Sequence, residues 1–322
     1  MTDTTLRPPF DPELEAALAL VRDQMPTTLT AEMIPPIRQN PMSGQDEIFI
    51  VLDERGFTRR DVTIAGHEGG EIVVTVIEKA GRTGTGPGFF HTHGGGMIVG
   101  DRWLGVVGFL DWAERFNGVI VTVEYRLAPE FPDPYPVEDC YAGLVWTATN
   151  AAELGIDPTR ILIGGASAGG GLAAGTSLLA RDRRGPALIG QLLMCPMLDD
   201  RDESVSTQQI DGIGVWDRGS NNVGWSALLG DRKGTGEVSI YAAPARATDL
   251  TGLPPAFIDC GSAEVFRDEN VAYASKLWAA GVQAELHVWA GGFHGFEIFA
   301  PHAAVSKASL AARDDWVNRL LG

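Results

Sequence analysis

Short runs of apolar and β-branched residues alternate with longer segments of helical periodicity along most of this chain. Several of the short runs are apolar at nearly every position, as in strands that are covered on both faces. This alternation predicts a mostly parallel sheet with helices on both sides. Strands are expected at residues 71–78, 88–91, 118–125, 160–164, 190–194, 256–260 and 284–289. Helices are expected near residues 104–116, 137–154, 170–181, 268–280 and 302–321.

Two segments interrupt the alternation. Residues 1 to about 50 contain an expected helix near residues 12–24 and then prolines that cannot lie in a central sheet, Pro26, Pro35, Pro36 and Pro41. Residues 198 to about 230 are largely polar but include two tryptophans. We predict a single domain over residues 1–322. In this domain both segments form a cap over the carboxyl ends of the strands, where open α/β sheets bind ligands.

The charge of the chain narrows its possible partners. There are 42 acidic and 25 basic residues, which gives a formal net charge of −17. Such a surface repels phosphate backbones and anionic lipid headgroups, so we expect neither nucleic acid nor a membrane as partner. The amino-terminal MTDTTLRPPF lacks the basic start and apolar core of a secretory signal, and no apolar run approaches the ~20 residues that span a bilayer. We therefore predict a cytoplasmic protein.

The chain contains three cysteines, Cys140, Cys195 and Cys260. They are too few and too widely spaced for a disulfide framework or a zinc knuckle. Because free cysteine is among the most buried residue types, we expect three free and mostly buried thiols.

A candidate nucleophile lies in the pentapeptide GASAG at residues 165–169, between an expected strand and an expected helix. That context is the one a nucleophile elbow requires, with Ser167 exposed on a tight turn at a helix N-terminus. The alternative is a Gly/Ser-rich phosphate-binding turn. The glycine spacing of a dinucleotide loop and the lysine of a P-loop are both absent, so the nucleophile is favoured.

A glycine-rich segment, HGGG at residues 93–96, follows the strand-like GFFHT. Glycines allow backbone amides to approach a substrate, and with the amide of Ala168 this loop would form an oxyanion hole. The alternative is a metal pair of His91 and His93, which alternation on a strand would place on one face. A hydrolytic metal site normally needs three protein ligands, so this alternative is less favoured.

The best candidate for a general base is His294, in the loop AGGFHGF after the last expected strand. Three carboxylates follow the preceding strand, at Glu264, Asp268 and Glu269. Asp268 and Glu269 are also ordinary residues for the first turn of a helix. Glu264 lies in the loop and is preferred as the partner of His294, with Asp268 as the alternative. Asp259 is expected to lie too deep in its strand.

These motifs together resemble those of the bacterial hormone-sensitive-lipase-like esterases, which have the α/β-hydrolase fold. The resemblance runs from Gly88 to the carboxyl terminus and includes YRLAPE at residues 125–130, PVED at 136–139 and DPTRI at 157–161. It implies a mostly parallel eight-stranded sheet with a helical cap. It also implies oxyanion amides from Gly95, Gly96 and Ala168, and an acid at Glu264. Family members usually have Asp where this chain has Ala166 and Glu264.

The resemblance implies a serine carboxylesterase that acts on short-chain esters, acetyl esters above all, through a Ser-His-Glu triad and an acyl-enzyme. No cofactor or metal is expected, the partner is a small-molecule ester, and a homodimer is a further expectation. A pocket could be lined by Met97, Trp103, Trp216, Trp225 and Phe296, although core packing explains each of them equally well. The rival functions are an amidase, lactonase or thioesterase with the same triad, a non-catalytic receptor of this fold, and metal-dependent hydrolysis.

Overall fold

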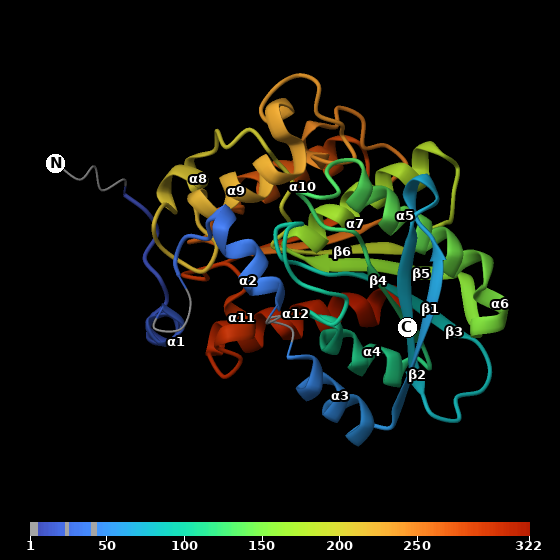
Figure 1. The fold of residues 1–322 in the computed structure, drawn as a ribbon. Coiled ribbons are helices and arrows are strands. Elements are labelled where there is room, and N and C mark those ends of the chain that lie inside the picture. The colour runs from blue at the N-terminus through green and yellow to red at the C-terminus, as the bar shows by residue number, and fades with distance from the viewer. Residues whose placement is uncertain (1–5, 23–25, 40–43) are drawn as a thin grey trace.

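The structure, a computed structural model, describes residues 6–22, 26–39 and 44–322. Within these residues one sheet contains eight strands in the order β1-β2-β4-β3-β5-β6-β7-β8 (Figure 1). The strands are β1 Phe57–Ala65, β2 Glu71–Lys79, β3 Gly86–Thr92, β4 Val119–Glu124, β5 Ile156–Ala166, β6 Gly190–Met194, β7 Ala256–Gly261 and β8 Ala284–Trp289.

The sheet is parallel from β4 to β8, and β2 runs antiparallel to both β1 and β4. All seven strands expected from the residues are present, and β6 and β8 have the expected bounds. The eighth, β1, is an edge strand that the residue pattern did not predict. Its sequence FTRRDVTIA exposes charged side chains, as edge strands commonly do, so it lacks the apolar run of the central strands.

Helices cover both faces of the sheet. One face carries α5, α7 and α10, and the other carries α3, α4 and α12 (Figure 1). The α-helices are α1 Pro12–Arg22, α2 Ile34–Gln39, α3 Gln45–Glu54, α4 Leu110–Arg115, α5 Tyr135–Thr149, α6 Ala151–Leu154, α7 Ala168–Asp182, α8 Val205–Gln209, α9 Arg218–Leu229, α10 Arg267–Ala279, α11 Phe296–Phe299 and α12 Ala304–Leu321. Short 3₁₀ turns are η1 Ala31–Met33, η2 His67–Gly69, η3 Val106–Phe109, η4 Gly230–Arg232 and η5 Pro244–Arg246.

The two segments predicted to form a cap are in contact with each other. Thr28 donates a hydrogen bond to Asp217 at the start of α9 (2.6 Å), and the Leu29 amide donates to Ser220 (2.8 Å). The expected helix at residues 12–24 is α1, which ends at Arg22 among the described residues. The last two positions of that predicted helix, 23 and 24, lie outside the described residues. The same holds for residues 1–5 of the predicted cap and for Pro41. Pro35 and Pro36 lie in α2, away from the sheet, as predicted.

All three cysteines are free and buried, which confirms the prediction for them. In the described part of the chain, no helix has both the length and the apolar character needed to cross a membrane.

Candidate active site

Ser167 lies at the turn between β5 and α7, with backbone angles φ 59° and ψ −124°. For a non-glycine residue such a conformation costs on the order of 1–3 kcal/mol and persists only where its surroundings enforce it. Here the end of β6 enforces it, because the Ser167 amide donates to the Met194 carbonyl (2.8 Å) and the Met197 amide donates to the Ser167 carbonyl (3.0 Å). The strained turn holds the serine hydroxyl clear of the strand.

The glycines of the turn are required by close backbone packing against β3. A Cβ atom on Gly165 would lie 2.3 Å from the carbonyl oxygen of Thr92, and one on Gly169 would lie 2.1 Å from the same oxygen. Either distance is far shorter than a van der Waals contact, so no side chain fits at these positions. The GxSxG pattern therefore follows from how tightly α7 crosses the end of β3.

His294 joins the serine to a carboxylate. Its Nε2 lies 2.9 Å from Ser167 Oγ, and its Nδ1 lies 3.2 Å from Glu264 Oε2. In the tautomer that suits both contacts, Nδ1–H donates to Glu264 and Nε2 accepts the hydroxyl proton of Ser167. The structure thus brings together the three residues that the sequence singled out as nucleophile, base and acid.

The loops that carry Glu264 and His294 are joined by backbone contacts. The Ala263 amide donates to the Gly292 carbonyl (2.9 Å), and a Cβ atom on Gly261 would lie 2.0 Å from that carbonyl oxygen. Phe266 packs edge-on against the His294 ring at 5.2 Å between ring centroids. These contacts fix the ring relative to the carboxylate.

Glu264 is buried, with 1% of the residue's surface exposed. Burial raises the pKa of Glu264 from its ordinary value, and the hydrogen bond and charge of His294 oppose the rise. Its second oxygen, Oε1, has no hydrogen-bond partner among the described residues. The alternative acid, Asp268, turns elsewhere: it accepts from the Ser206 amide (2.8 Å) and from Arg267 (2.8 Å).

The glycine loop lies beside the elbow and is held by aromatic stacking. The His93 ring stacks on Tyr125 at 4.0 Å between centroids, and Tyr125 donates its hydroxyl proton to the His93 carbonyl (2.9 Å). Gly95 and Gly96 have φ angles of 108° and 62°, which favour glycine. In the described part of the chain no acceptor contacts the backbone amides of Gly95, Gly96 or Ala168. As hydrogen-bond donors they are unused within these residues.

The alternative metal pair has different contacts. His91 Nδ1 lies 2.9 Å from Thr122 Oγ1, and His93 Nδ1 donates to the Gly94 carbonyl (2.8 Å). Burial, with a smaller contribution from His93, lowers the pKa of His91 to about 3. Both rings thus have structural partners within the fold.

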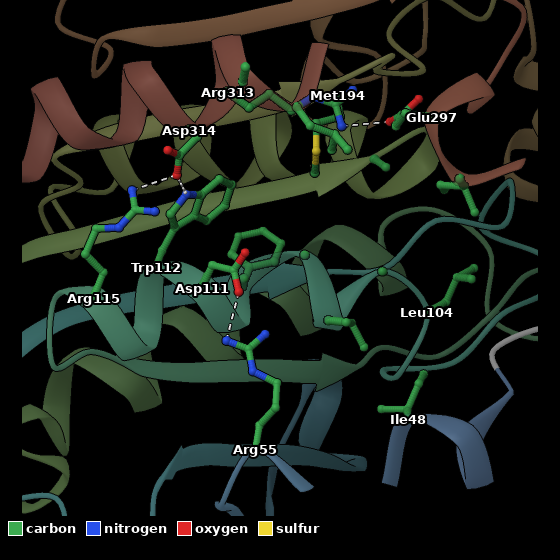
Figure 2. Close-up of a pocket in the computed structure, with 18 residues that line it drawn as sticks. Ile48, Arg55, Leu104, Asp111, Trp112, Arg115, Met194, Glu297, Arg313 and Asp314 are labelled. Carbon is green, nitrogen blue, oxygen red and sulfur yellow. Dashed lines mark hydrogen bonds and ion pairs between the residues drawn. The ribbon is translucent and has the colours of Figure 1, made fainter. Parts of the chain in front are cut away.

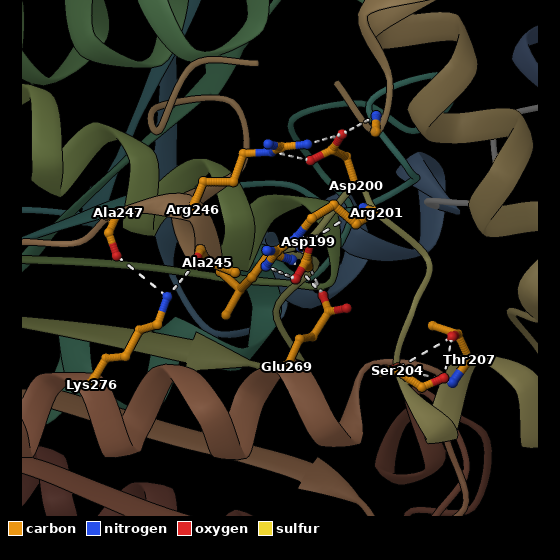
Figure 3. Close-up of polar contacts among 12 residues, drawn as sticks. Asp199, Asp200, Arg201, Ser204, Thr207, Ala245, Arg246, Ala247, Glu269 and Lys276 are labelled. Carbon is orange, nitrogen blue, oxygen red and sulfur yellow. Dashed lines mark hydrogen bonds and ion pairs between the residues drawn. The ribbon is translucent and has the colours of Figure 1, made fainter. Parts of the chain in front are cut away.

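The segment after β6 is fixed by α10. Buried Glu269 accepts from the amides of Leu198 (2.6 Å) and Asp199 (3.2 Å), and Asn270 donates to the Pro196 carbonyl (2.7 Å). Figure 3 shows Glu269 projecting from the helix towards this segment. Because the same segment supports Ser167, α10 positions the elbow indirectly.

The residue pattern identified Cys195, which directly follows β6, as a buried free thiol but did not place it beside the site. Its sulfur lies within 4.8 Å of a carboxylate oxygen of Glu264 and a ring nitrogen of His294. A signal was available, because the carboxyl ends of parallel strands meet at one edge of a sheet, and Cys195 and Glu264 follow neighbouring strands.

The five residues suggested for a pocket are all buried in the structure: Met97, Trp103, Trp216, Trp225 and Phe296. Trp216 contacts the glycine loop, since its ring lies 2.3 Å from where a Cβ atom on Gly96 would be. Trp103 packs edge-on against Phe49 of α3 at 4.8 Å between centroids, within the cluster on the α3, α4 and α12 face.

A separate cavity of about 800 Å³ lies on the face covered by α4 and α12 (Figure 2). Its wall includes Trp112, which donates to Asp314 (3.0 Å), and Arg55, which pairs with Asp111 (2.8 Å). It reaches Ala166, the residue before the nucleophile, but no member of the Ser167–His294–Glu264 group is among its described lining residues.

Comparison with known proteins finds related sequences and structures over nearly the whole chain. A family model described as the alpha/beta hydrolase fold matches residues 89–298. The carboxylesterase NlhH of Mycobacterium tuberculosis is 35% identical over 308 residues, 93% of each chain. A solved structure called bacterial heroin esterase has a TM-score of 0.88 and 38% identity, and covers 97% of this chain and 98% of that one. Esterase LipW from Mycobacterium marinum has a TM-score of 0.85 and 30% identity, with 98% of each chain covered.

Proposed function

We propose that this chain, which belongs to the hormone-sensitive-lipase-like group of the α/β hydrolase family and is a carboxylic ester hydrolase, uses Ser167, His294 and Glu264 as its catalytic residues. We further propose that its substrates are short-chain esters. The observation that carries this proposal is the continuous contact from Ser167 Oγ through the His294 ring to Glu264. No other carboxylate among the described residues has a hydrogen bond or ion pair with His294.

The proposed reaction has two halves. His294 Nε2 takes the proton of Ser167 as its oxygen attacks the ester carbonyl, and the ring then returns that proton to the departing alcohol. Water attacks the acyl-enzyme by the same route. Glu264 holds the ring in the tautomer that leaves Nε2 free to accept a proton, and it stabilises the imidazolium that forms.

The proposed oxyanion hole consists of the amides of Gly95, Gly96 and Ala168. Gly96 and Ala168 are buried, and the lack of an acceptor for their amides within the described residues supports this role, because buried amides normally have one. The amide of Gly95, which is half-buried, has no acceptor there either. The position of Ala168 at the N-terminus of α7 adds the positive end of a helix dipole. Each donor would contribute roughly 2.7–4 kcal/mol in the transition state.

The cap predicted from residues 1 to about 50 and 198 to about 230 is part of the proposal. The hydrogen bonds from residues 28 and 29 to the start of α9 support it, since they join the two segments. Trp216 against Gly96 would place one apolar wall at the oxyanion loop. A tryptophan there leaves little space, which favours short acyl groups such as acetyl. The likeness to the heroin esterase structure agrees with that preference. The cytoplasmic location and the homodimer stay predictions.

The test is hydrolysis of acetyl, butyryl and octanoyl aryl esters by the wild type and by Ser167→Ala. We expect acetyl esters to be cleaved fastest and the variant to lose activity by a factor on the order of 10⁶. Ser177→Ala is the matched control, because Ser177 is a buried serine of α7, the helix that follows the elbow, and its hydroxyl donates to the Ala173 carbonyl (2.8 Å) rather than to the proposed triad. Full activity in Ser167→Ala would overturn the proposal.

Matched amide, lactone and thioester substrates separate the rival activities of the same triad. We expect the ester to be the best of these substrates. The metal-dependent rival predicts inactivation by a chelator, whereas the proposed triad predicts none.

A further inference from the structure

A thiol lies next to the proposed triad. Cys195, Glu264 and His294 are all buried, with 5%, 1% and 8% of their surfaces exposed, and each offers one donor atom within 4.8 Å of the other two. They form the only such group of three potential metal ligands in the parts of the chain that the structure describes. Glu264 Oε1 adds an independent observation, because it is a buried oxygen without a hydrogen-bond partner there.

We propose that Cys195, Glu264 and His294 form an inhibitory site for thiophilic divalent cations such as Zn²⁺, Cd²⁺ and Co²⁺. One sulfur, one oxygen and one nitrogen are ligands that zinc accepts together, and solvent can take the fourth position. Bonds of about 2.0–2.3 Å require each donor to move by less than about 1 Å from its present place. The inference rests on the proposed function, because the cation inhibits by engaging the proposed base.

The chemistry of the ligands selects the cation. Burial raises the pKa of the Cys195 thiol, so a cation must displace its proton to bind the sulfur. Hard cations such as Mg²⁺ and Ca²⁺ prefer oxygen ligands and gain little from a thiolate. We therefore expect no inhibition by Mg²⁺ or Ca²⁺.

Inhibition follows from the tautomer of His294. Its Nδ1 faces Glu264, so a cation in this group binds Nδ1 in place of the proton donated there. In a neutral ring the proton must then sit on Nε2. Nε2–H can no longer accept the proton of Ser167, which lies 2.9 Å away. The thiol proton leaves to solvent, and no bond of the substrate takes part.

The test uses the full chain with Zn²⁺ and Co²⁺ as probes. Zn²⁺ should inhibit ester hydrolysis reversibly, and EDTA should restore it. Cys195→Ala and Cys195→Ser should each raise the zinc concentration that halves the rate by at least about tenfold, with each variant measured against its own rate without zinc. Removing a residue that only supports a metal ligand already weakens metal binding by about tenfold or more, and removing a ligand itself should weaken it further. Cys140→Ala, which removes a buried thiol of α5, should leave it unchanged. Equal zinc sensitivity in the wild type and both Cys195 variants would overturn the proposal.

Co²⁺ binding to Ser167→Ala provides a measurement that needs no turnover. We expect a thiolate-to-cobalt charge-transfer absorption that disappears when Cys195→Ser is added. Its absence in Ser167→Ala would contradict the metal site while leaving the proposed triad intact. Conversely, a cobalt band in a Ser167→Ala protein that still hydrolyses esters would leave the metal site standing and overturn the proposed nucleophile.

Discussion

Two buried carboxylates lie at the carboxyl end of β7 and have opposite surroundings. Asp259, inside the strand, accepts from Trp289 (3.0 Å), Ser309 (2.9 Å) and the guanidinium of Arg313 (2.9 Å). Glu264, in the loop that follows, has one partner among the described residues, His294. The first carboxylate accepts three hydrogen bonds on Oδ2, one of them from a cation, whereas the second depends on a titratable ring.

The difference separates a structural charge from one suited to chemistry. Burial alone would lower the pKa of Arg313, but Asp259 and Glu297 raise it above its ordinary range, so the guanidinium stays charged and neutralises the carboxylate. Among the described residues, Glu264 has no such permanent cation as a partner. Its charge is balanced only when His294 becomes an imidazolium, which is the state that the proposed reaction creates.

Among substitutions of these two carboxylates, the largest expected effect is on catalytic activity. Glu264→Gln should lower kcat by about 10⁴-fold, because the amide can stabilise the wrong tautomer of His294 and cannot stabilise its charged form. Steady-state hydrolysis of an acetyl aryl ester measures the change.

Asp268→Asn is the control for that variant. Asp268 follows the same strand but contacts Ser206 and Arg267, so kcat should change little. A collapse of kcat in Asp268→Asn with an active Glu264→Gln would reverse the assignment of the acid.

The next effect is on stability. Asp259→Asn should reduce the free energy of unfolding by about 1.5–3 kcal/mol, because it removes the charge that accepts from the buried Arg313, while Glu297 stays as the second partner of that guanidinium. Urea denaturation followed by circular dichroism measures this change. Asp314→Asn, which affects the surface ion pair with Arg115, should cost no more than about 1 kcal/mol. Equal losses in the two variants would show that burial does not distinguish these carboxylates.

The smallest effect is the pH dependence of stability at Glu264. Because the pKa of Glu264 is raised above 4.5 in the folded state, ionisation of this group disfavours folding as pH rises through the folded pKa. Gln cannot ionise. Glu264→Gln should therefore gain stability relative to wild type as pH rises from about 4 to 8. Denaturation curves across this range give the difference in unfolding free energy between the variant and the wild type, and a difference that stays constant or moves in favour of the wild type as pH rises would contradict the idea.

The residue pattern predicted the central strands and brought Ser167 and His294 forward because their signals are local. A glycine-flanked serine between strand and helix, and a late histidine in a glycine-rich loop, can be recognised without knowing distant contacts. The strand β1 was missed because its charged, exposed side chains hide its strand character. Five helices, α2, α3, α8, α9 and α11, were not predicted individually, and all are short or lie in the segments that interrupt the alternation.

The identity of the acid, the place of Cys195 and the pocket residues depend on long-range packing. Glu264 and Asp268 lie four residues apart after one strand, and only the contacts of the folded chain, Ser206 for one and His294 for the other, separate them. The place of Cys195 depends on how β6 and β7 pair and on how their loops turn. Trp103 and Trp225 were suggested for the pocket wall, and both are buried in the structure. The sequence alone does not distinguish a tryptophan in the hydrophobic core from one that lines a pocket.

The most direct test of the central claim is mass spectrometry of the chain after reaction with an aryl organophosphate, which leaves a stable phosphoryl group on an activated serine. We predict one adduct, on the peptide that contains Ser167, with loss of activity in proportion to labelling and no adduct in Ser167→Ala. Labelling of another residue in proportion to the loss of activity, or an adduct that persists in Ser167→Ala, would contradict the account.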